Sequence, residues 1–154
     1  NIKAICDRCN SVLIINDSVE ICKAVDADGV HLGKNDISIL EARKILGNNK
    51  IIGGTANTIE DVMQLENDGA NYIGLGPYKF TETKKNLNTI LGINGYSIIQ
   101  QLNNSTIPII AIGGIQVEDV KPLINTGVYG VAVSSAINLS ENKEAAIKSF
   151  IDLV

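Results

Sequence analysis

Short apolar runs recur along the chain, and polar residues rarely interrupt them. Continuous runs of this kind are typical of strands that are covered on both faces of a parallel sheet, because a half-exposed strand would alternate apolar and polar residues. On this pattern we predict six strands, over residues 12–15, 29–32, 50–53, 71–75, 108–112 and 130–133.

Helical patterns lie between these strands. Two pairs of residues have the spacing of a capping box, in which a hydroxyl and an acidic side chain cap the same helix start, Ser38 with Glu41 and Thr58 with Asp61. The pattern predicts helices over residues 39–46, 59–68, 117–126 and 142–153. Residues 1–10 would be the end of a further helix.

Regular alternation of strands and helices leaves two architectures, a TIM (β/α)8 barrel or an open doubly wound sheet. Glycines at the carboxyl ends of the strands favour the barrel. A TIM barrel has eight strands and typically at least about 200 residues, whereas this sequence shows six strands and begins without methionine. We therefore expect an α/β fold, a partial TIM barrel that lacks the first two βα units.

The composition indicates one domain over residues 1–154, since 45% of the residues are apolar and the chain is too short for two ordinary domains. The net charge of −4 gives no basic footprint for nucleic acid. No apolar run reaches the length of about 18 residues that a membrane span needs, and no export leader is recognisable. We expect a cytoplasmic protein with no nucleic-acid or membrane partner, which could form a homo-oligomer.

The three cysteines form an odd set, which argues against a disulfide framework and favours a reducing compartment. Cys6 and Cys9 have the spacing of a redox or zinc motif, but a zinc site would want a second pair. We interpret them as two small apolar residues at a helix end.

Polar side chains follow the first two predicted strands. Asn16 and Asp17 come directly after the first strand, and Asp36 lies in the loop after the second. Two carboxylates from adjacent loops can converge, and hard oxygen ligands suit Mg²⁺, which lets substrate oxygens and water complete its shell. The alternative is that both aspartates are helix N-caps.

His31 lies within the second apolar strand. It is either a core histidine with satisfied hydrogen bonds or, if its side chain points into the ring near the top, a ligand contact.

Glycines and serines end the last two strands, at Gly113 and Gly114 and at Ser134 and Ser135. Glycine lets backbone N–H groups approach an anion closely, and many barrels bind phosphate at this pair of loops. The simpler alternative for the two glycines is a tight turn.

The segment YIGLGPYKFTETK, residues 72–84, runs from an apolar strand through a Gly-Pro turn into polar residues. Thr81, Thr83 and Lys84 there, with Thr55 after the third strand, suit an anionic group at the carboxyl edge of the sheet. Plain solvent exposure is the alternative. The sequence therefore predicts a phosphorylated substrate.

At these residues the chain resembles the thiamine phosphate synthase family, from about Leu13 to Ile137. The blocks that carry the resemblance are IIND, ADGVHLGKND, IIGGT, YIGLGPYKFTETK, PIIAIGGI and GVAVSSAI, in the family's order and spacing. In that family a hydroxymethylpyrimidine diphosphate loses pyrophosphate and is joined to a thiazole phosphate. The resemblance thus implies an Mg²⁺-dependent transferase of thiamine biosynthesis on a TIM barrel.

The resemblance also implies roles for single residues. Mg²⁺ would be bound by Asp17 and Asp36, and the catalytic groups that hold the diphosphate would be Asn16 and Lys84. The pyrimidine and diphosphate region would be lined by His31 and Thr55. The thiazole phosphate would be contacted by Thr81, Thr83, Gly114 and the backbone of Ser134 and Ser135.

The sequence departs from the family in three places. Where the family often has serine, this chain has Thr55, which keeps the hydroxyl, and Ala132, which loses it. The basic cluster that the family carries on its second strand is absent from this sequence.

Three alternatives stay open. A thiazole tautomerase of the same superfamily shares the phosphate loops but has no diphosphate to bind, so Asn16, Asp17, Asp36 and Lys84 speak against it. Other phosphate-binding barrel isomerases explain the glycines and serines but not the TETK loop beside two carboxylates. A barrel that binds a phosphorylated ligand without catalysis would not release pyrophosphate.

Overall fold

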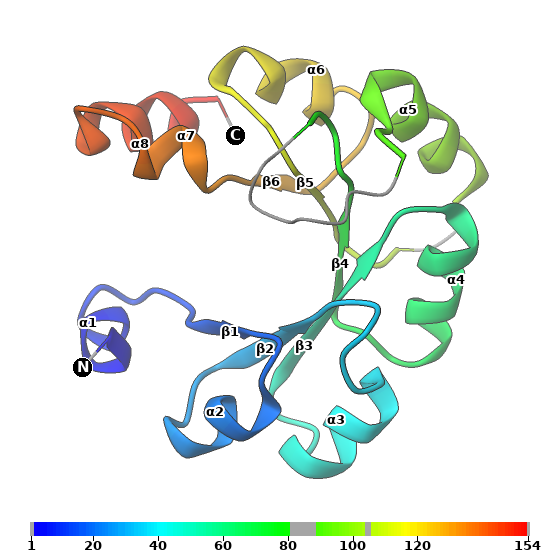
Figure 1. The fold of residues 1–154 in the computed structure, drawn as a ribbon, viewed down its shortest axis with the longest axis vertical. Helices are drawn as coiled ribbons and strands as arrows, with labels where there is room; N and C mark the ends of the chain where they lie inside the picture. The colour runs from blue at the N-terminus through cyan, green and yellow to red at the C-terminus, as the bar shows by residue number, and fades with distance from the viewer. Residues whose placement is uncertain (1, 81–88, 104–105, 154) are drawn as a thin grey trace.

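Six parallel strands form one curved sheet in the computed structural model, which describes residues 2–80, 89–103 and 106–153. In sequence order the strands are β1 (Ile14–Asn16), β2 (Gly29–Leu32), β3 (Ile51–Ala56), β4 (Tyr72–Leu75), β5 (Ile109–Ile112) and β6 (Gly130–Ala132). Figure 1 shows the sheet as an arc that is open between β1 and β6. The expected partial barrel is confirmed, and the doubly wound sheet is excluded because the strand order never reverses.

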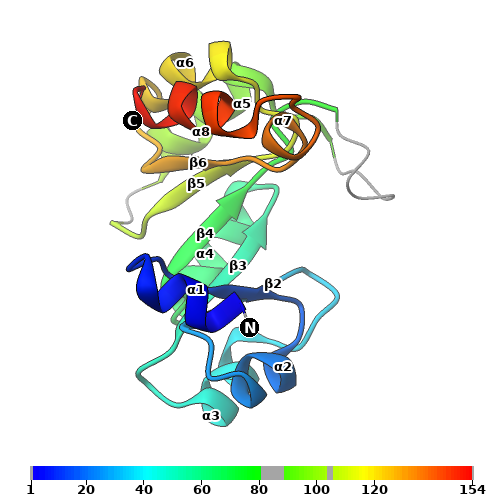
Figure 2. The ribbon, with the colours of Figure 1, turned by 90° about the vertical axis from the view of Figure 1, so that its left-hand side faces the viewer.

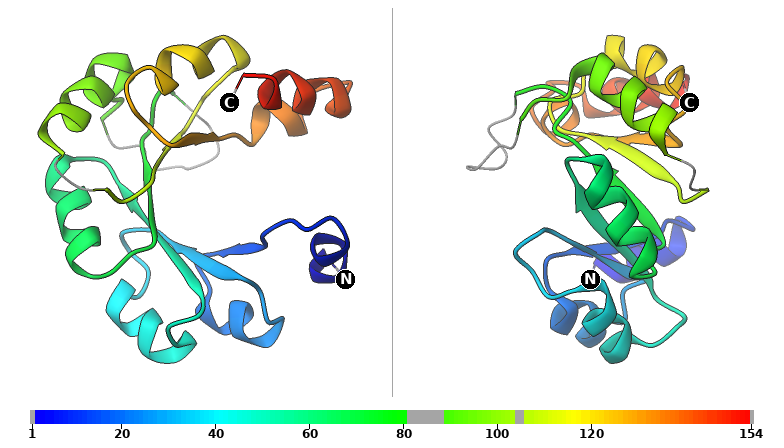
Figure 3. Two further views of the ribbon diagram at one scale, coloured as in Figure 1. Left: turned by 180° about the vertical axis from the view of Figure 1, so that it is seen from behind. Right: turned by 90° about the vertical axis from the view of Figure 1, so that its right-hand side faces the viewer.

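Helices surround the convex side of the arc, with α1 at one end and α7 and α8 at the other (Figures 2 and 3). They are α1 (Ile2–Arg8), α2 (Val19–Ala24), α3 (Ile39–Leu46), α4 (Ile59–Asn67), α5 (Gly92–Leu102), the 3₁₀ helix η1 (Val117–Asp119), α6 (Val120–Ile124), α7 (Ser135–Asn138) and α8 (Lys143–Ile151). Within the described ranges, none of these helices has the length and apolar character needed to cross a membrane.

The predicted helix starts are largely confirmed. Both capping boxes are present, at the starts of α3 and α4. The single helix predicted over residues 117–126 is wrong, since it consists of η1 followed by α6. Pro122 lies inside that stretch and has no N–H to donate, which weakens a continuous α-helix there.

Alternate residues of each strand face the helices and form the core. One apolar cluster lies beneath α2 and α3 and includes Val19, Cys22, Val30 and Ile52. A second lies beneath α4, α5 and α6 and includes Ile73, Tyr96, Ile109 and Leu123. The remaining strand residues face the concave side, and those near the carboxyl ends are the candidates for function.

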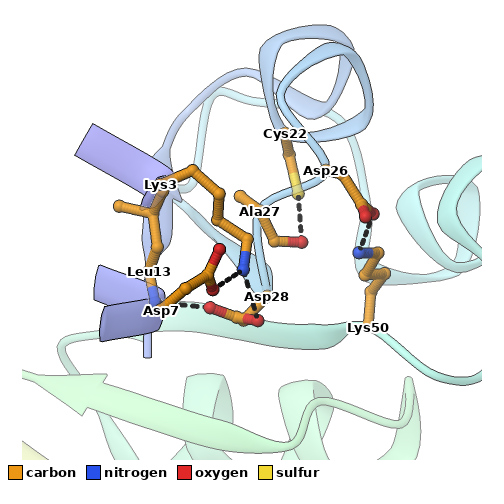
Figure 4. A network of polar contacts seen from close by, with 8 residues as sticks. All are labelled: Lys3, Asp7, Leu13, Cys22, Asp26, Ala27, Asp28 and Lys50. Carbon is orange, nitrogen blue, oxygen red and sulfur yellow. Dashed lines mark hydrogen bonds and ion pairs between the residues drawn. The ribbon is translucent and has the colours of Figure 1, made fainter. Parts of the chain in front are cut away.

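A network of charged groups lies at the amino ends of β1, β2 and β3, opposite the candidate site (Figure 4). Lys3 of α1 contacts Asp7 at 2.5 Å and Asp28 at 3.5 Å, and Asp28 also accepts a hydrogen bond from the Leu13 amide at 2.8 Å. The interaction with the Leu13 amide, more than that with Lys3, lowers the pKa of Asp28 below its ordinary value. At this end of a barrel, such contacts stabilise the fold and take no part in catalysis.

The cysteines have free thiols. Cys6 and Cys9 lie at the end of α1, where we expected them, and Cys22 lies on the buried face of α2. Among the described residues, no group of three or more histidine, cysteine or acidic side chains is arranged to hold a metal.

Candidate functional site

The polar residues predicted from the first two strands meet at the carboxyl edge of the sheet. Asn16 is the last residue of β1 and pairs in register with His31 of β2. The Asp17 amide then donates to the His31 carbonyl at 2.8 Å, so Asp17 lies directly beside β2.

Asp17 has a strained backbone. Its φ is 67°, in the left-handed region, and the Ser18 amide donates back to the Asn16 carbonyl at 2.8 Å. A three-residue turn of this kind is rare, and strain is commonly retained where a side chain must be aimed for function. The N-cap alternative for Asp17 is wrong, because the side chain of Ser18 caps α2 by accepting from the Ile21 amide at 3.2 Å.

Asp36 lies in the next loop and is also not an N-cap, since Ser38 caps α3. Its Oδ2 atom accepts a hydrogen bond from the Gly33 amide at 2.6 Å, which fixes the carboxylate at the end of β2. The β1–β2 ladder ends at the pair of Asn16 and His31, so Asp17 follows it by one residue and Gly33 follows it by two. The two aspartates therefore occupy adjacent loops at one edge, where their oxygens suit Mg²⁺ with substrate and water as further ligands.

His31 lies on the concave side, half-buried, between two hydroxyl groups. Its Nδ1 atom is 3.0 Å from the Tyr72 hydroxyl, and its Nε2 atom is 3.0 Å from Thr55 Oγ1. The imidazole also stacks on the Tyr72 ring, with the ring centroids 5.4 Å apart. Burial raises the pKa of Tyr72 to about 12, so its hydroxyl is neutral at physiological pH. The interpretation of His31 as a residue with satisfied hydrogen bonds is confirmed. Its side chain faces the interior of the arc, and its contact with a ligand stays a prediction.

Two glycines make room for this arrangement. A Cβ atom on Gly53 would come within 2.2 Å of the Tyr72 ring, and one on Gly74 within 2.9 Å of His31 Cε1. Tyr72 itself was not predicted as a site residue, because it lies in an apolar strand and no polar neighbour marks it. Its pairing with Gly53 in the neighbouring strand was a signal that could have pointed to it.

The second group of polar positions lies at the ends of β5 and β6. Ile112 pairs with Ala132, so the turn of Gly113 and Gly114 and the Ser134–Ser135 step leave neighbouring strands at the same edge. The two glycines have φ angles of 92° and 68°, so the tight turn is present as well.

Three predicted residues, Thr81, Thr83 and Lys84, lie outside the described residues. Their assigned roles stay predictions. The segment that leads to them is described up to Phe80, and it passes over the glycine turn.

Comparisons with known proteins agree with this geometry. Residues 1–137 match the family model described as thiamine monophosphate synthase. The chain is 54% identical over 144 residues to the thiamine-phosphate synthase of Flavobacterium psychrophilum, covering 92% of this chain and 70% of that protein. It is 44% identical to the enzyme of the same name from Bacteroides thetaiotaomicron, covering 99% and 74%. The solved thiamine phosphate pyrophosphorylase from Pyrococcus furiosus superposes with a TM-score of 0.87 at 30% identity, over 98% of this chain and 71% of that one. The chain therefore belongs to the thiamine monophosphate synthase family.

Proposed function

We propose that the protein joins hydroxymethylpyrimidine diphosphate to a thiazole phosphate and releases pyrophosphate, a step of thiamine biosynthesis. The observation that carries the proposal is the pairing of two sites at one edge of the sheet: Asp17 and Asp36 after β1 and β2, and the glycine turn with Ser134 and Ser135 after β5 and β6. One site suits a metal-bound diphosphate, and the other suits a monophosphate.

On the diphosphate side, Asp17 and Asp36 would hold Mg²⁺, and Asn16 and Lys84 would contact the diphosphate. When bound, the metal would supply positive charge against the departing pyrophosphate oxygens. The left-handed turn at Asp17 supports this role, because strain of this kind is commonly retained where a residue serves a function.

The pyrimidine would bind against His31, Thr55 and Tyr72. As the C–O bond to the diphosphate breaks, the bonding electrons leave with pyrophosphate, and the electron-rich aminopyrimidine can bear the positive charge that remains. The thiazole nitrogen then forms the new C–N bond with its lone pair. No proton must be removed, so the side chains have to position the reactants rather than act as a strong base.

The thiazole phosphate would be held by the backbone around Gly114, Ser134 and Ser135, with Thr81 and Thr83. Its partners would thus be small phosphorylated molecules. We also expect the protein to act in the cytoplasm, where its free thiols would stay reduced.

The test measures pyrophosphate release and product formation from both substrates with Mg²⁺. Asp17→Asn keeps a residue that tolerates the left-handed backbone but removes the charge, and kcat/KM should fall about 100-fold or more. Asp26 gives a matched control, because its φ is also positive, at 52°. Asp26 lies before β2, at the opposite end of the sheet, where its 87% exposed side chain pairs with Lys50. Asp26→Asn should leave activity unchanged.

Three results would contradict the proposal: wild-type protein that releases no pyrophosphate, turnover without any divalent cation, or equal activity of the two variants. Metal-independent isomerisation of the thiazole phosphate would favour the tautomerase instead.

A further inference from the structure

The segment after β4 packs directly onto the glycine turn after β5. The Tyr78 amide donates to the Ile112 carbonyl at 2.8 Å, and the Lys79 amide donates to the Gly113 carbonyl at 3.0 Å. A Cβ atom on Gly114 would lie 2.6 Å from the Phe80 carbonyl oxygen. The segment of residues 77–80 therefore holds the glycine turn in its conformation.

A salt bridge also connects this segment to η1, the helix that follows the glycine turn. Lys79 Nζ lies 2.7 Å and 2.9 Å from the two carboxylate oxygens of Asp119, in η1. The Lys79 side chain is 47% exposed, whereas that of Asp119 is only 8% exposed. An isolated buried carboxylate is costly, so Asp119 depends on its partners.

Asp119 has two further partners, the Gln116 amide and the Tyr78 hydroxyl. Gln116 lies beyond the glycine turn. The Oδ2 atom of Asp119 accepts from the Gln116 amide at 3.0 Å, and the Tyr78 hydroxyl lies 3.4 Å from Oδ1. Burial alone would raise the pKa of Asp119, but the hydrogen bonds from Lys79 and the Gln116 amide hold it below its ordinary value. The carboxylate is therefore charged at physiological pH.

These contacts hold the glycine turn from both ends. The Tyr78 amide binds Ile112, the residue before the turn, and Asp119 binds the amide of Gln116, two residues after it. Among the described residues, a second salt bridge at this edge, Lys34 with Asp61 at 2.5 Å, joins the loop after β2 to the first turn of α4.

We propose that Lys79 and Asp119 are positioning residues, which set the affinity for the monophosphate substrate by holding the turn of Gly113 and Gly114 in its binding conformation. This inference rests on the proposed function, because it assumes that the turn binds the phosphate of the thiazole. Neither residue needs to touch the substrate. Among the described residues, neither side chain contacts Asn16, Asp17 or Asp36, so we expect the larger effect on the monophosphate substrate.

The experiment measures both KM values for Lys79→Met, Asp119→Asn and Lys79→Arg. In the first two variants the KM for thiazole phosphate should rise about tenfold, as expected when a turn loses an interaction equivalent to one charge-assisted hydrogen bond. The KM for the pyrimidine diphosphate should rise clearly less, because Lys79 and Asp119 contact none of the described residues assigned to that substrate. Lys79→Arg should restore the first KM, since arginine keeps the charge and can bind both oxygens.

Lys148→Met is the matched control, because Lys148 pairs with Asp152 in an exposed i,i+4 salt bridge of α8. It should change neither KM. Asp119→Asn should fold even if Lys79→Met does not, since an amide oxygen can still accept from the Gln116 amide.

Two outcomes overturn the inference: an equal rise of both KM values, or unchanged KM values with a lower melting temperature alone. If the wild-type protein shows no turnover, the proposed function fails separately, and calorimetry with inorganic phosphate decides the inference. Weaker phosphate binding by Asp119→Asn than by wild type then supports it, and equal binding overturns it.

Discussion

At the scale of single residues, two glycines on the concave face of the sheet differ in what a side chain would meet. A Cβ atom on Gly74 would lie 2.9 Å from His31 Cε1, whereas one on Gly130 would find only Ile110 Cδ1, at 3.8 Å. His31 cannot move aside freely, because both of its ring nitrogens are hydrogen-bonded. The space over Gly74 is therefore occupied by His31, a residue of the candidate pyrimidine site.

Gly74→Ala should therefore displace His31 and break one of its hydrogen bonds. We expect a loss of stability of about 1–3 kcal/mol, typical of overpacking, together with a higher KM for the pyrimidine diphosphate. Gly130→Ala should be neutral or stabilising by up to about 1 kcal/mol, because alanine restricts the unfolded chain more than glycine. Urea unfolding and steady-state kinetics check both variants, and an equal response of the two would show that the contact with His31 does not matter.

The candidate site could be predicted in part at this scale. Position after a strand was sufficient to select Asp17 and Asp36, because the carboxyl ends of parallel strands share one edge. Thr55 was expected after the third strand but lies within β3, which extends to Ala56. The sequence could not show the contact of His31 with Tyr72, which joins residues from β2 and β4 across the intervening β3. It also gave no sign of the left-handed backbone at Asp17, since strain depends on the fold around it.

At the scale of helices and strands, the predictions succeeded where the chain carries local signals. Capping boxes made the starts of α3 and α4 visible. Three helices were not predicted. Helix α2 has a serine cap without an acidic partner at the third position, and α5 begins at Gly92 without any side-chain cap. Both form because packing on the sheet outweighs weak local preference. The third, α7, has four residues, and Ser134 before it makes no side-chain cap hydrogen bond.

Helix α1 differs from the other long helices in its anchoring. None of its residues is buried, and Lys3 connects it to Asp28 at the start of β2. Helix α8, by contrast, places Phe150 in the core with 6% exposure. We therefore expect α1 to depend on one polar contact, and α8 to depend on apolar packing.

Lys3→Met should raise the rate of amide hydrogen exchange throughout α1 and leave the sheet protected, because local opening follows the loss of a local anchor. Lys148→Met removes a salt bridge of α8 in the same way but leaves Phe150 in place, so exchange in α8 should change little. Exchange followed by mass spectrometry gives both results. Unchanged protection of α1 in the first variant would show that other contacts hold it.

At the scale of the whole molecule, the two apolar clusters belong to one sheet. The cluster under α2 and α3 contains Cys22, and the cluster under α4, α5 and α6 contains Leu123, both fully buried. Leu65 packs against both clusters, and the β3–β4 ladder joins the two halves. Continuous hydrogen bonding and a shared side chain favour a single cooperative unit, as the prediction of one domain requires.

The thiol of Cys22 makes this cooperativity measurable. It is inaccessible in the folded protein, and burial raises its pKa, so it should react with a thiol reagent only after the surrounding structure opens. With Cys6 and Cys9 replaced by serine, Cys22 is the only thiol left. Leu123→Ala in this background creates a cavity in the opposite cluster and should cost about 2–5 kcal/mol of unfolding free energy.

If the two halves unfold together, labelling of Cys22 should accelerate by the factor that corresponds to the stability lost, because opening of the amino-terminal half then requires global unfolding. Urea unfolding followed by circular dichroism supplies the stability of each variant, and the labelling rate under conditions of fast reclosing supplies the free energy of opening at Cys22. Ile52→Val, next to Cys22 in its own cluster, is the positive control, since it must change both quantities. Labelling that responds to Ile52→Val but not to Leu123→Ala would show that the sheet opens in two parts, with the loops of Asp17 and Asp36 on one unit and the glycine turn on the other.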